Sequence, residues 1–171
     1  MTTPPDKSGL SPFKGTWCFF IAVFLNAFVD LGHKITIQNT LFKLYSGPYQ
    51  VIMTALVNAL ILLPFIVLLT PAGFLSDRYN KLRIMRATGW SGVAICAGIV
   101  QCYYLGWFMP AFVMTLLLAT QSALYSPAKY GFIKEFFGRQ RLGEVNGIVS
   151  ALAIVSILAG TLAFSITFEA L

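Results

Sequence analysis

Charged and reactive side chains are scarce in this sequence. Lys, Arg, Asp and Glu together make up 11% of the chain, against about 25% in an ordinary soluble domain, whereas apolar residues make up 57%. The only histidine, His33, has no Asp five residues after it, and the sequence has neither a glycine-rich nucleotide loop nor a serine nucleophile elbow. These absences argue against an enzyme and predict an integral membrane protein.

The cysteines and the net charge exclude two further classes. Cys18, Cys96 and Cys102 lie inside apolar segments and lack metal-ligand spacing, so we interpret them as packing residues and expect no metal or cofactor. The net charge is +6, but the cations fall in short clusters between apolar runs rather than along one basic face. Such clusters are not typical of a nucleic-acid-binding protein.

The apolar runs predict an all-α membrane protein with five transmembrane helices, because a bilayer core requires about 20 apolar residues of helix. The run between Arg86 and Lys129 is too long for one helix and must fold back, with the break at Gly106 to Pro110, where a helix stop, aromatic residues and a helix start coincide. We expect a disordered cytoplasmic tail over residues 1–15 and a membrane domain over residues 16–171. The predicted helices cover residues 16–41, 49–70, 84–105, 110–126 and 145–168.

Lys and Arg residues are distributed very unequally between the two sides of this predicted topology. One side has only Lys43, whereas the other has the cations of the tail and of the second and fourth connections. These cations are Lys7, Lys14, Arg78, Lys81, Arg83, Arg86, Lys129, Lys134, Arg139 and Arg141. The positive-inside rule then predicts a cytoplasmic N-terminus.

Polar residues interrupt the first predicted helix. Asn26, Asp30 and Lys34 are spaced four apart and therefore share one helix face, where Asp30 and Lys34 can pair. Each charge costs on the order of 3 kcal/mol in the bilayer. Either the stripe holds the helices together, or it lines a cavity and binds a substrate with a charged head. His33 is a candidate proton relay or hydrogen-bonding residue, and Gln121 in the fourth helix is a further candidate for substrate binding.

The segment from Ala72 to Lys81 predicts a short charged turn between the second and third helices. Gly73 allows close helix approach, Asp77 can pair with a cation or a helix N-terminus, and Arg78 and Lys81 face the cytoplasmic surface. This segment resembles the signature loop of the major facilitator superfamily, although Ser76, Asn80 and Leu82 depart from it. Asn80 stands where glycine is usual and tolerates a positive φ. The resemblance implies gating roles for Gly73, Asp77, Arg78, Lys81 and Lys129.

Three stretches resemble the lysophospholipid transporter branch of that superfamily. The most distinctive is Gln121-Ser-Ala-Leu-Tyr-Ser-Pro-Ala-Lys-Tyr-Gly-Phe-Ile-Lys-Glu135, and the others are Phe28 to Lys34 and Asn146-Gly147 with Leu158 to Thr161. The resemblance implies a carrier of lysophospholipid across the bacterial inner membrane for reacylation, in some members fused to an acyltransferase. Val29, Leu31 and Ser150 replace polar residues of the family and leave the substrate open.

Other interpretations remain at this point. The chain is alternatively a carrier of another small amphipathic or organic solute, or a non-transporting membrane scaffold subunit. A facilitator carrier has two six-helix halves with the substrate between them, which five helices cannot enclose. We therefore expect part of an N-terminal half, from a truncated product, a gene fragment or a split gene, whose partners are membrane lipid and a missing C-terminal half or fused acyltransferase.

Overall fold

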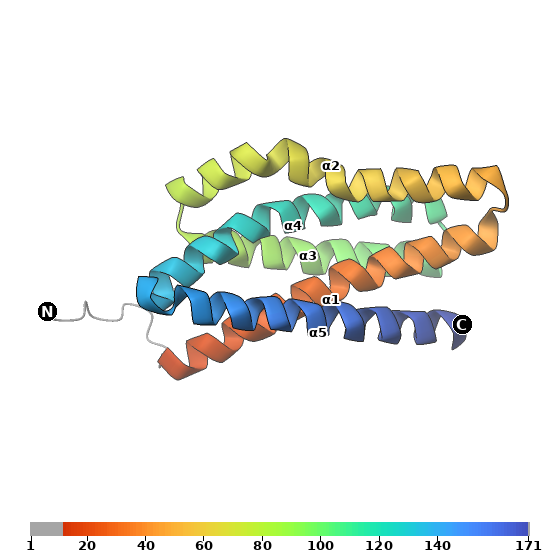
Figure 1. Ribbon diagram of the computed structural model, residues 1–171. Coiled ribbons are helices and arrows are strands. Elements are labelled where there is room, and N and C mark those ends of the chain that lie inside the picture. Colours follow the sequence, from red (N-terminus) through yellow and green to blue (C-terminus); the bar gives the residue numbers. More distant parts are fainter. Residues whose placement is uncertain (1–11, 171) are drawn as a thin grey trace, which may run out of the picture.

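The computed structural model describes residues 12–170, and within this range the chain is helical with no strand. Five long helices run along one axis (Figure 1). They are α1 (Pro12–Leu44), α2 (Pro48–Arg78), α3 (Lys81–Tyr104), α4 (Phe108–Phe137) and α5 (Leu142–Ala170), with a short 3₁₀ helix, η1 (Arg139–Arg141), before α5. The all-α prediction is confirmed. The predicted tail over residues 1–15 lies outside the described residues except for its last positions, which belong to α1.

Four of these helices are long and apolar enough to cross a membrane. The candidate spans are Gly15–Leu44, Pro48–Arg78, Phe108–Phe137 and Arg139–Glu169. Helix α3 is not among them, although its 24 residues correspond to about 36 Å of helix. Its composition is the reason, because three cations occupy its first two turns and small polar residues follow. The predicted count of five spans is therefore not confirmed, since four helices qualify as candidate spans and α3 is less apolar.

Helix α2 continues through most of the segment predicted to be a turn. It ends at Arg78, so only Tyr79 and Asn80 connect it to α3. Asn80 has a φ of −63°, which corrects the expectation of a positive φ. Its side-chain oxygen accepts hydrogen bonds from the backbone N–H groups of Leu82 and Arg83, at 3.0 and 3.3 Å. Asn80 therefore acts as the N-cap of α3.

Helix α4 likewise runs beyond its predicted end at residue 126. It passes through Pro127 and Gly131 to Phe137. Proline removes only one helical hydrogen bond, and packing against neighbouring membrane helices compensates for that loss. The helix ends instead at Gly138, whose φ of 77° lies in the region that favours glycine. The predicted break near Gly106 is confirmed, because Gly106 has a φ of 70° and α4 begins at Phe108.

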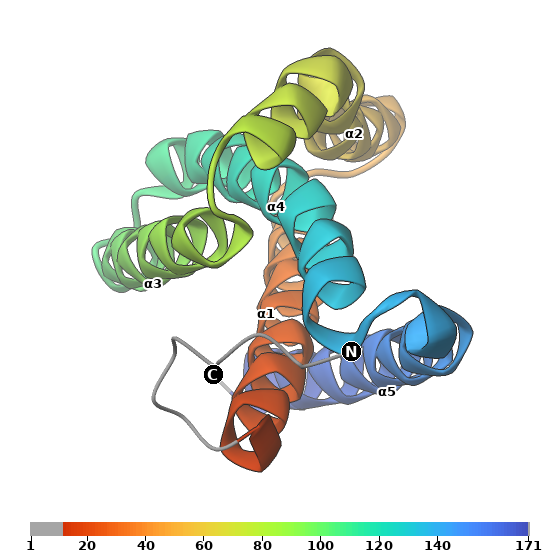
Figure 2. The same ribbon diagram turned by 90° about the vertical axis from the view of Figure 1, so that its left-hand side faces the viewer.

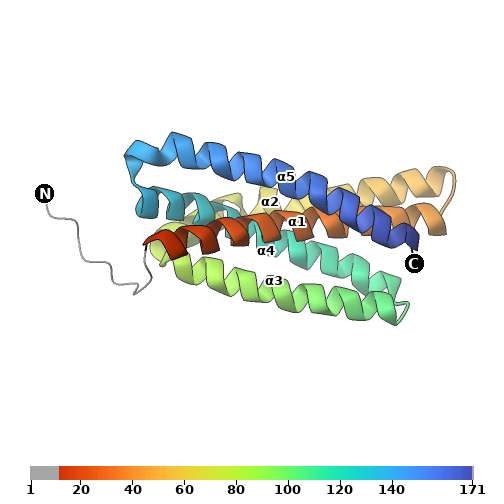
Figure 3. The same ribbon diagram turned by 90° about the horizontal axis from the view of Figure 1, so that it is seen from below.

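Helix α4 lies between α2 and α3, while α1 packs along α5 (Figure 2). Seen from below, α5 crosses α1 at a shallow angle (Figure 3). Glycine makes this crossing close, because a Cβ at Gly160 would lie 2.7 Å from the backbone oxygen of Phe28. Gly32 faces the ring of Phe164 in the same seam. Small residues bring membrane helices together in this way.

Gly73 does not take part in such a contact. Among the described residues a Cβ at Gly73 would meet no atom within 4 Å, so these helices make no close approach there. The gating role that the resemblance implies for Gly73 therefore has no packing contact to support it in this part of the chain.

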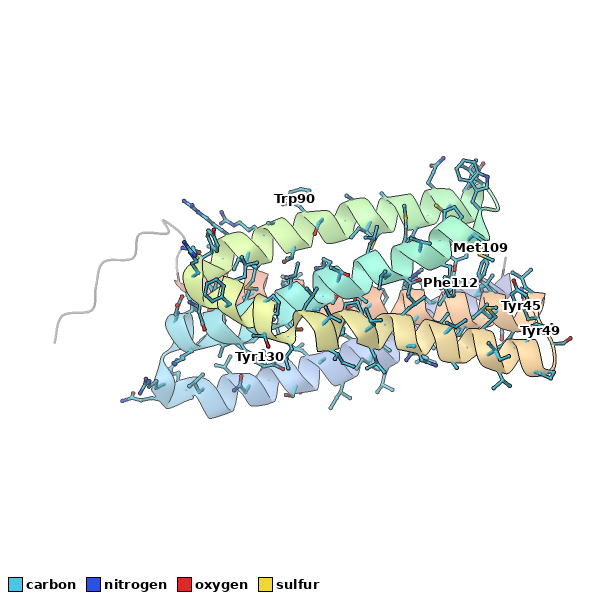
Figure 4. The ribbon with its side chains drawn as sticks, turned by 90° about the horizontal axis from the view of Figure 1, so that it is seen from above. Tyr45, Tyr49, Trp90, Met109, Phe112 and Tyr130 are labelled. Carbon is cyan, nitrogen blue, oxygen red and sulfur yellow. The ribbon has the colours of Figure 1, made fainter. Side chains whose placement is uncertain are left out.

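Aromatic side chains mark both ends of the bundle. Tyr45, Tyr49 and Met109 lie at the end that holds the α1–α2 and α3–α4 turns, with Phe112 nearby, whereas Tyr130 lies toward the other end (Figure 4). Tyr49 and Tyr130 are exposed. Aromatic residues are enriched at both interfaces of a bilayer, and this distribution fits an integral membrane protein.

Two apolar clusters flank a polar level in the middle of α1. One cluster contains Phe19 and Val23 of α1 with residues of α3, α4 and α5. The other contains Ile37 and Leu41 of α1 with Val57 of α2. The polar residues of α1 lie between these clusters in sequence, so the fold holds them away from both ends of the bundle.

Candidate functional site

Four polar side chains from α1 and α4 form one hydrogen-bond network. Asn26 and Asp30 lie one turn apart on α1, and Gln121 and Ser122 are adjacent on α4. The Ser122 hydroxyl lies 2.5 Å from Oδ2 of Asp30. The amide of Gln121 donates to Oδ1 of Asn26 at 3.1 Å. The predicted substrate residues Asn26, Asp30 and Gln121 are therefore brought together.

The direction of each hydrogen bond in this network follows from the number of hydrogens that each side chain carries. Ser122 has one hydroxyl hydrogen, which it donates to Asp30, so its 3.1 Å contact with Oε1 of Gln121 is an alternative to that bond. The Nδ2 group of Asn26 has two hydrogens and lies 3.4 Å from both Oδ2 of Asp30 and the Ser122 hydroxyl. Gln121 and Ser122 are buried, whereas Asn26 and Asp30 are half-buried. Polar groups inside a bilayer need such partners.

Lys34 does not pair with Asp30, which corrects the sequence-based expectation. Within residues 12–170 the only ion pair joins Lys81 to Glu135. Lys34 is half-buried one turn beyond Asp30 on α1 and makes no ion pair or side-chain hydrogen bond in the described part of the chain. The Lys34 ammonium group is therefore unpaired within residues 12–170.

Lys129 lies within α4 rather than in the connection after the fourth helix, where the sequence placed it. It is half-buried on α4, where its ammonium group lies 4.6 Å from the centre of the Tyr130 ring. It also interacts electrostatically with Asp30. The gating residue predicted at this position is therefore coupled by charge to the polar network.

His33 ties α1 to α4 at a second point. Its Nε2 lies 2.9 Å from the hydroxyl oxygen of Thr115, and both residues are buried. The Thr115 hydroxyl also lies 3.3 Å from the backbone oxygen of Ala111, and the tautomer of His33 determines to which of the two partners Thr115 donates its single hydrogen. Of the two roles considered for His33, this geometry fits the hydrogen-bonding role.

A cavity of about 280 Å³ lies at the end of the bundle that holds the α2–α3 and α4–α5 connections. Its lining residues are Asp77, Lys81, Gly131, Lys134, Glu135 and Arg139. Lys81 and Glu135 form an ion pair at 2.5 Å, which ties the start of α3 to the last turn of α4. Gly131 leaves room for this lysine, because a Cβ there would lie 3.0 Å from Cε of Lys81.

The other residues predicted to gate make weaker contacts. Asp77 is exposed and forms no ion pair within residues 12–170, so its predicted pairing with a cation is absent there. The guanidinium of Arg78 lies 6.0 Å from the centre of the Phe74 ring. Among the predicted gating residues, Lys81 alone is held by an ion pair in the described structure.

Sequence reasoning missed Ser122, Thr115 and the Lys81–Glu135 pair. Ser122 adjoins Gln121, a residue predicted to bind substrate. A buried carboxylate on α1 also requires hydrogen-bond donors from a neighbouring helix. That requirement points to the polar residues of α4 as a class. It does not select among them, because the selection depends on which face of α4 meets α1.

Comparison with known proteins identifies similar transporters. The chain is 30% identical over 166 residues to the lysophospholipid transporter LplT of Serratia proteamaculans, an alignment covering 95% of this chain and 38% of that protein. It is 30% identical over 162 residues to LplT of Yersinia enterocolitica, with 92% and 36% covered. It is 32% identical over 155 residues to LplT of Salmonella heidelberg, with 88% and 35% covered.

These alignments confirm the resemblance inferred from the sequence motifs. The chain spans about a third of the length of the curated relatives it matches. The names of those relatives are names of transporters and not of enzymes. No protein-family model matches the chain, and no solved structure matches it.

Proposed function

We propose that this chain is part of a major facilitator carrier that moves lysophospholipid across the bacterial cytoplasmic membrane for reacylation. The similarity to lysophospholipid transporters supports this function, together with the membrane-spanning helices. The observation that carries it is Lys34, which lies one turn beyond Asp30 on α1 and makes no ion pair within residues 12–170. An uncompensated cation inside a bilayer costs on the order of 3 kcal/mol, which a bound anion offsets.

The two charges of a lysophosphatidylethanolamine head match this arrangement. Its phosphate is the anion that Lys34 lacks, and its ammonium is a donor for the carboxylate of Asp30. The single acyl chain requires apolar surface, and α2 and α5 expose large apolar side chains along much of their length. The proposed substrate site therefore comprises Asn26, Asp30, Lys34 and Gln121, with Ser122 added from the structure.

In this proposal the helices supply part of the N-terminal half of the carrier. Helix α3 is the fifth span, and the end of the bundle with the α2–α3 turn faces the cytoplasm because the cations gather there. The remaining helices of a carrier of the relatives' length cover the substrate site from the other side. Lys81 and Glu135, with Asp77 nearby, form the cytoplasmic part of the gate.

A chimera tests this function directly. The aligned segment of the Serratia relative is replaced by this chain, and uptake of radiolabelled lysophosphatidylethanolamine is measured in membrane vesicles. We expect the chimera to take up the lipid and Lys34→Met to raise KM by about 10- to 100-fold, the effect of losing one charged hydrogen bond. Lys43→Met is the matched control, because Lys43 is an exposed lysine near the end of α1.

Two results would contradict the proposal. One is a chimera that reaches the membrane in the same amount as the parent and takes up no lysophospholipid. The other is an equal KM for Lys34→Met and Lys43→Met, because the unpaired lysine would then have no part in binding. Uptake of a different amphipathic solute by the same chimera would favour the alternative that the chain is part of a carrier of another small amphipathic or organic solute.

A further inference from the structure

We propose that Ser122 is a positioning residue that determines which oxygen of Asp30 faces the ligand. The identity of the ligand rests on the proposed function, whereas the hydrogen bond between the two side chains does not. Both described hydrogen bonds to the carboxylate end on the same atom, since Ser122 and Asn26 both contact Oδ2. Oδ1 accepts none of the described hydrogen bonds.

Oδ1 of Asp30 is not among the fully buried polar atoms without a partner, although the side chain itself is half-buried. In the described residues, the buried side-chain polar atoms without a partner are the hydroxyls of Tyr103 and Tyr125. Oδ1 has no partner and is not one of these atoms, so it retains accessible surface. A carboxylate oxygen that has no partner and is not fully buried is a hydrogen-bond acceptor available to a ligand.

Ser122 determines this arrangement because it approaches from the opposite helix. Asn26 lies on α1 with Asp30 and moves with it, whereas Ser122 is fixed on α4 and is 3% exposed. Without the Ser122 hydroxyl, Asp30 is free to turn toward a cation, either Lys34 at the i+4 position where Asp and Lys pair on a helix or Lys129 on α4, whose charge already acts on Asp30. One hydroxyl therefore keeps Oδ1 available as an acceptor and keeps Lys34 available for an anion.

Infrared spectroscopy of the purified chain tests the hydrogen bond without any substrate. The sequence has three aspartates, Asp6, Asp30 and Asp77, so ¹³C-aspartate labelling gives few carboxyl bands, and loss of a band in Asp30→Asn assigns it. We expect Ser122→Ala to shift the Asp30 band and Ser122→Thr to restore it, because threonine keeps the hydroxyl. Asp77→Asn should leave the Asp30 band unchanged. An unchanged Asp30 band in Ser122→Ala would overturn the proposal.

Thermal unfolding in detergent measures the coupling between the two side chains. Ser122→Ala is expected to lower Tm by about 5 °C when Asp30 is present, the effect of one lost bond to a charged group. In the Asp30→Ala background the same change should lower Tm by less than half as much. Equal losses in both backgrounds would show that Ser122 does not act through Asp30.

Uptake by the chimera then tests whether the positioning serves the ligand. Ser122→Ala should raise KM for lysophosphatidylethanolamine about tenfold with little change in the maximum rate, and Ser122→Thr should restore KM. An unchanged KM in Ser122→Ala would overturn the role toward the ligand. If no version of the chimera takes up lysophospholipid, the proposed function fails, while the infrared and unfolding results still decide whether Ser122 positions Asp30.

Discussion

Two glycines on α5 are expected to respond to the same substitution with opposite signs. A Cβ at Gly160 would lie 2.7 Å from the backbone oxygen of Phe28, whereas ordinary contact begins at 3.4 Å. Helix α5 would therefore have to move away from α1 by roughly 0.7 Å, or Phe28 would have to shift with its helix. At Gly147 a Cβ would meet nothing within 4 Å.

The free energies follow from these distances. Overpacking of this kind costs about 1–3 kcal/mol, and the better helix propensity of alanine returns up to about 1 kcal/mol. Because the clash at Gly160 is with backbone, its cost lies in the upper part of that range, about 2–3 kcal/mol, and the net destabilisation by Gly160→Ala is about 1–2 kcal/mol. Gly147→Ala retains only the propensity gain and is expected to stabilise it by up to about 1 kcal/mol.

Thermal unfolding of the purified protein in detergent, followed by circular dichroism at 222 nm, checks this prediction. A change of 1 kcal/mol moves Tm by about 2–4 °C for a domain of this size. Gly160→Ala should lower Tm by about 2–8 °C, and Gly147→Ala should raise it by up to about 4 °C. If the two variants had the same Tm, the close crossing of α1 and α5 at Phe28 would be refuted.

Three further substitutions test other contacts of the structure. Asn80→Ala should cost about 1 kcal/mol in a denaturant titration, while Asn80→Ser should cost much less because serine also caps a helix; equal costs would contradict the capping role. Thr115→Val should cost about 1–3 kcal/mol, because His33 then loses its buried partner, and an unchanged Tm would contradict that hydrogen bond. Lys81→Met should cost about 1 kcal/mol or less, since Glu135 is largely exposed; a wild-type unfolding energy that does not fall on adding salt would argue against a contribution from the pair.

The membrane class and the order of the helices were predictable from the sequence. The thickness of a bilayer requires apolar runs of about 20 residues, so the runs and the turn at Gly106 mark where helices lie and where one must reverse. The ends of the helices were not predictable to the same degree. Pro71 and Pro127 are unfavourable in an isolated helix, yet α2 and α4 continue through them. Packing between helices outweighs these local preferences.

The sequence by itself determined which residues of α1 are polar and that their spacing places them on one face. Helical periodicity is a local property, so Asn26, Asp30 and Lys34 could be aligned without any knowledge of the fold. Only the tertiary structure decided the partner of Asp30. Lys34 and Ser122 both offer a hydrogen bond to this carboxylate, and the choice depends on which face of α4 meets α1. Ser122 is the partner of Asp30, and Lys34 makes no ion pair within residues 12–170. The proposed binding site rests on this difference between the two side chains.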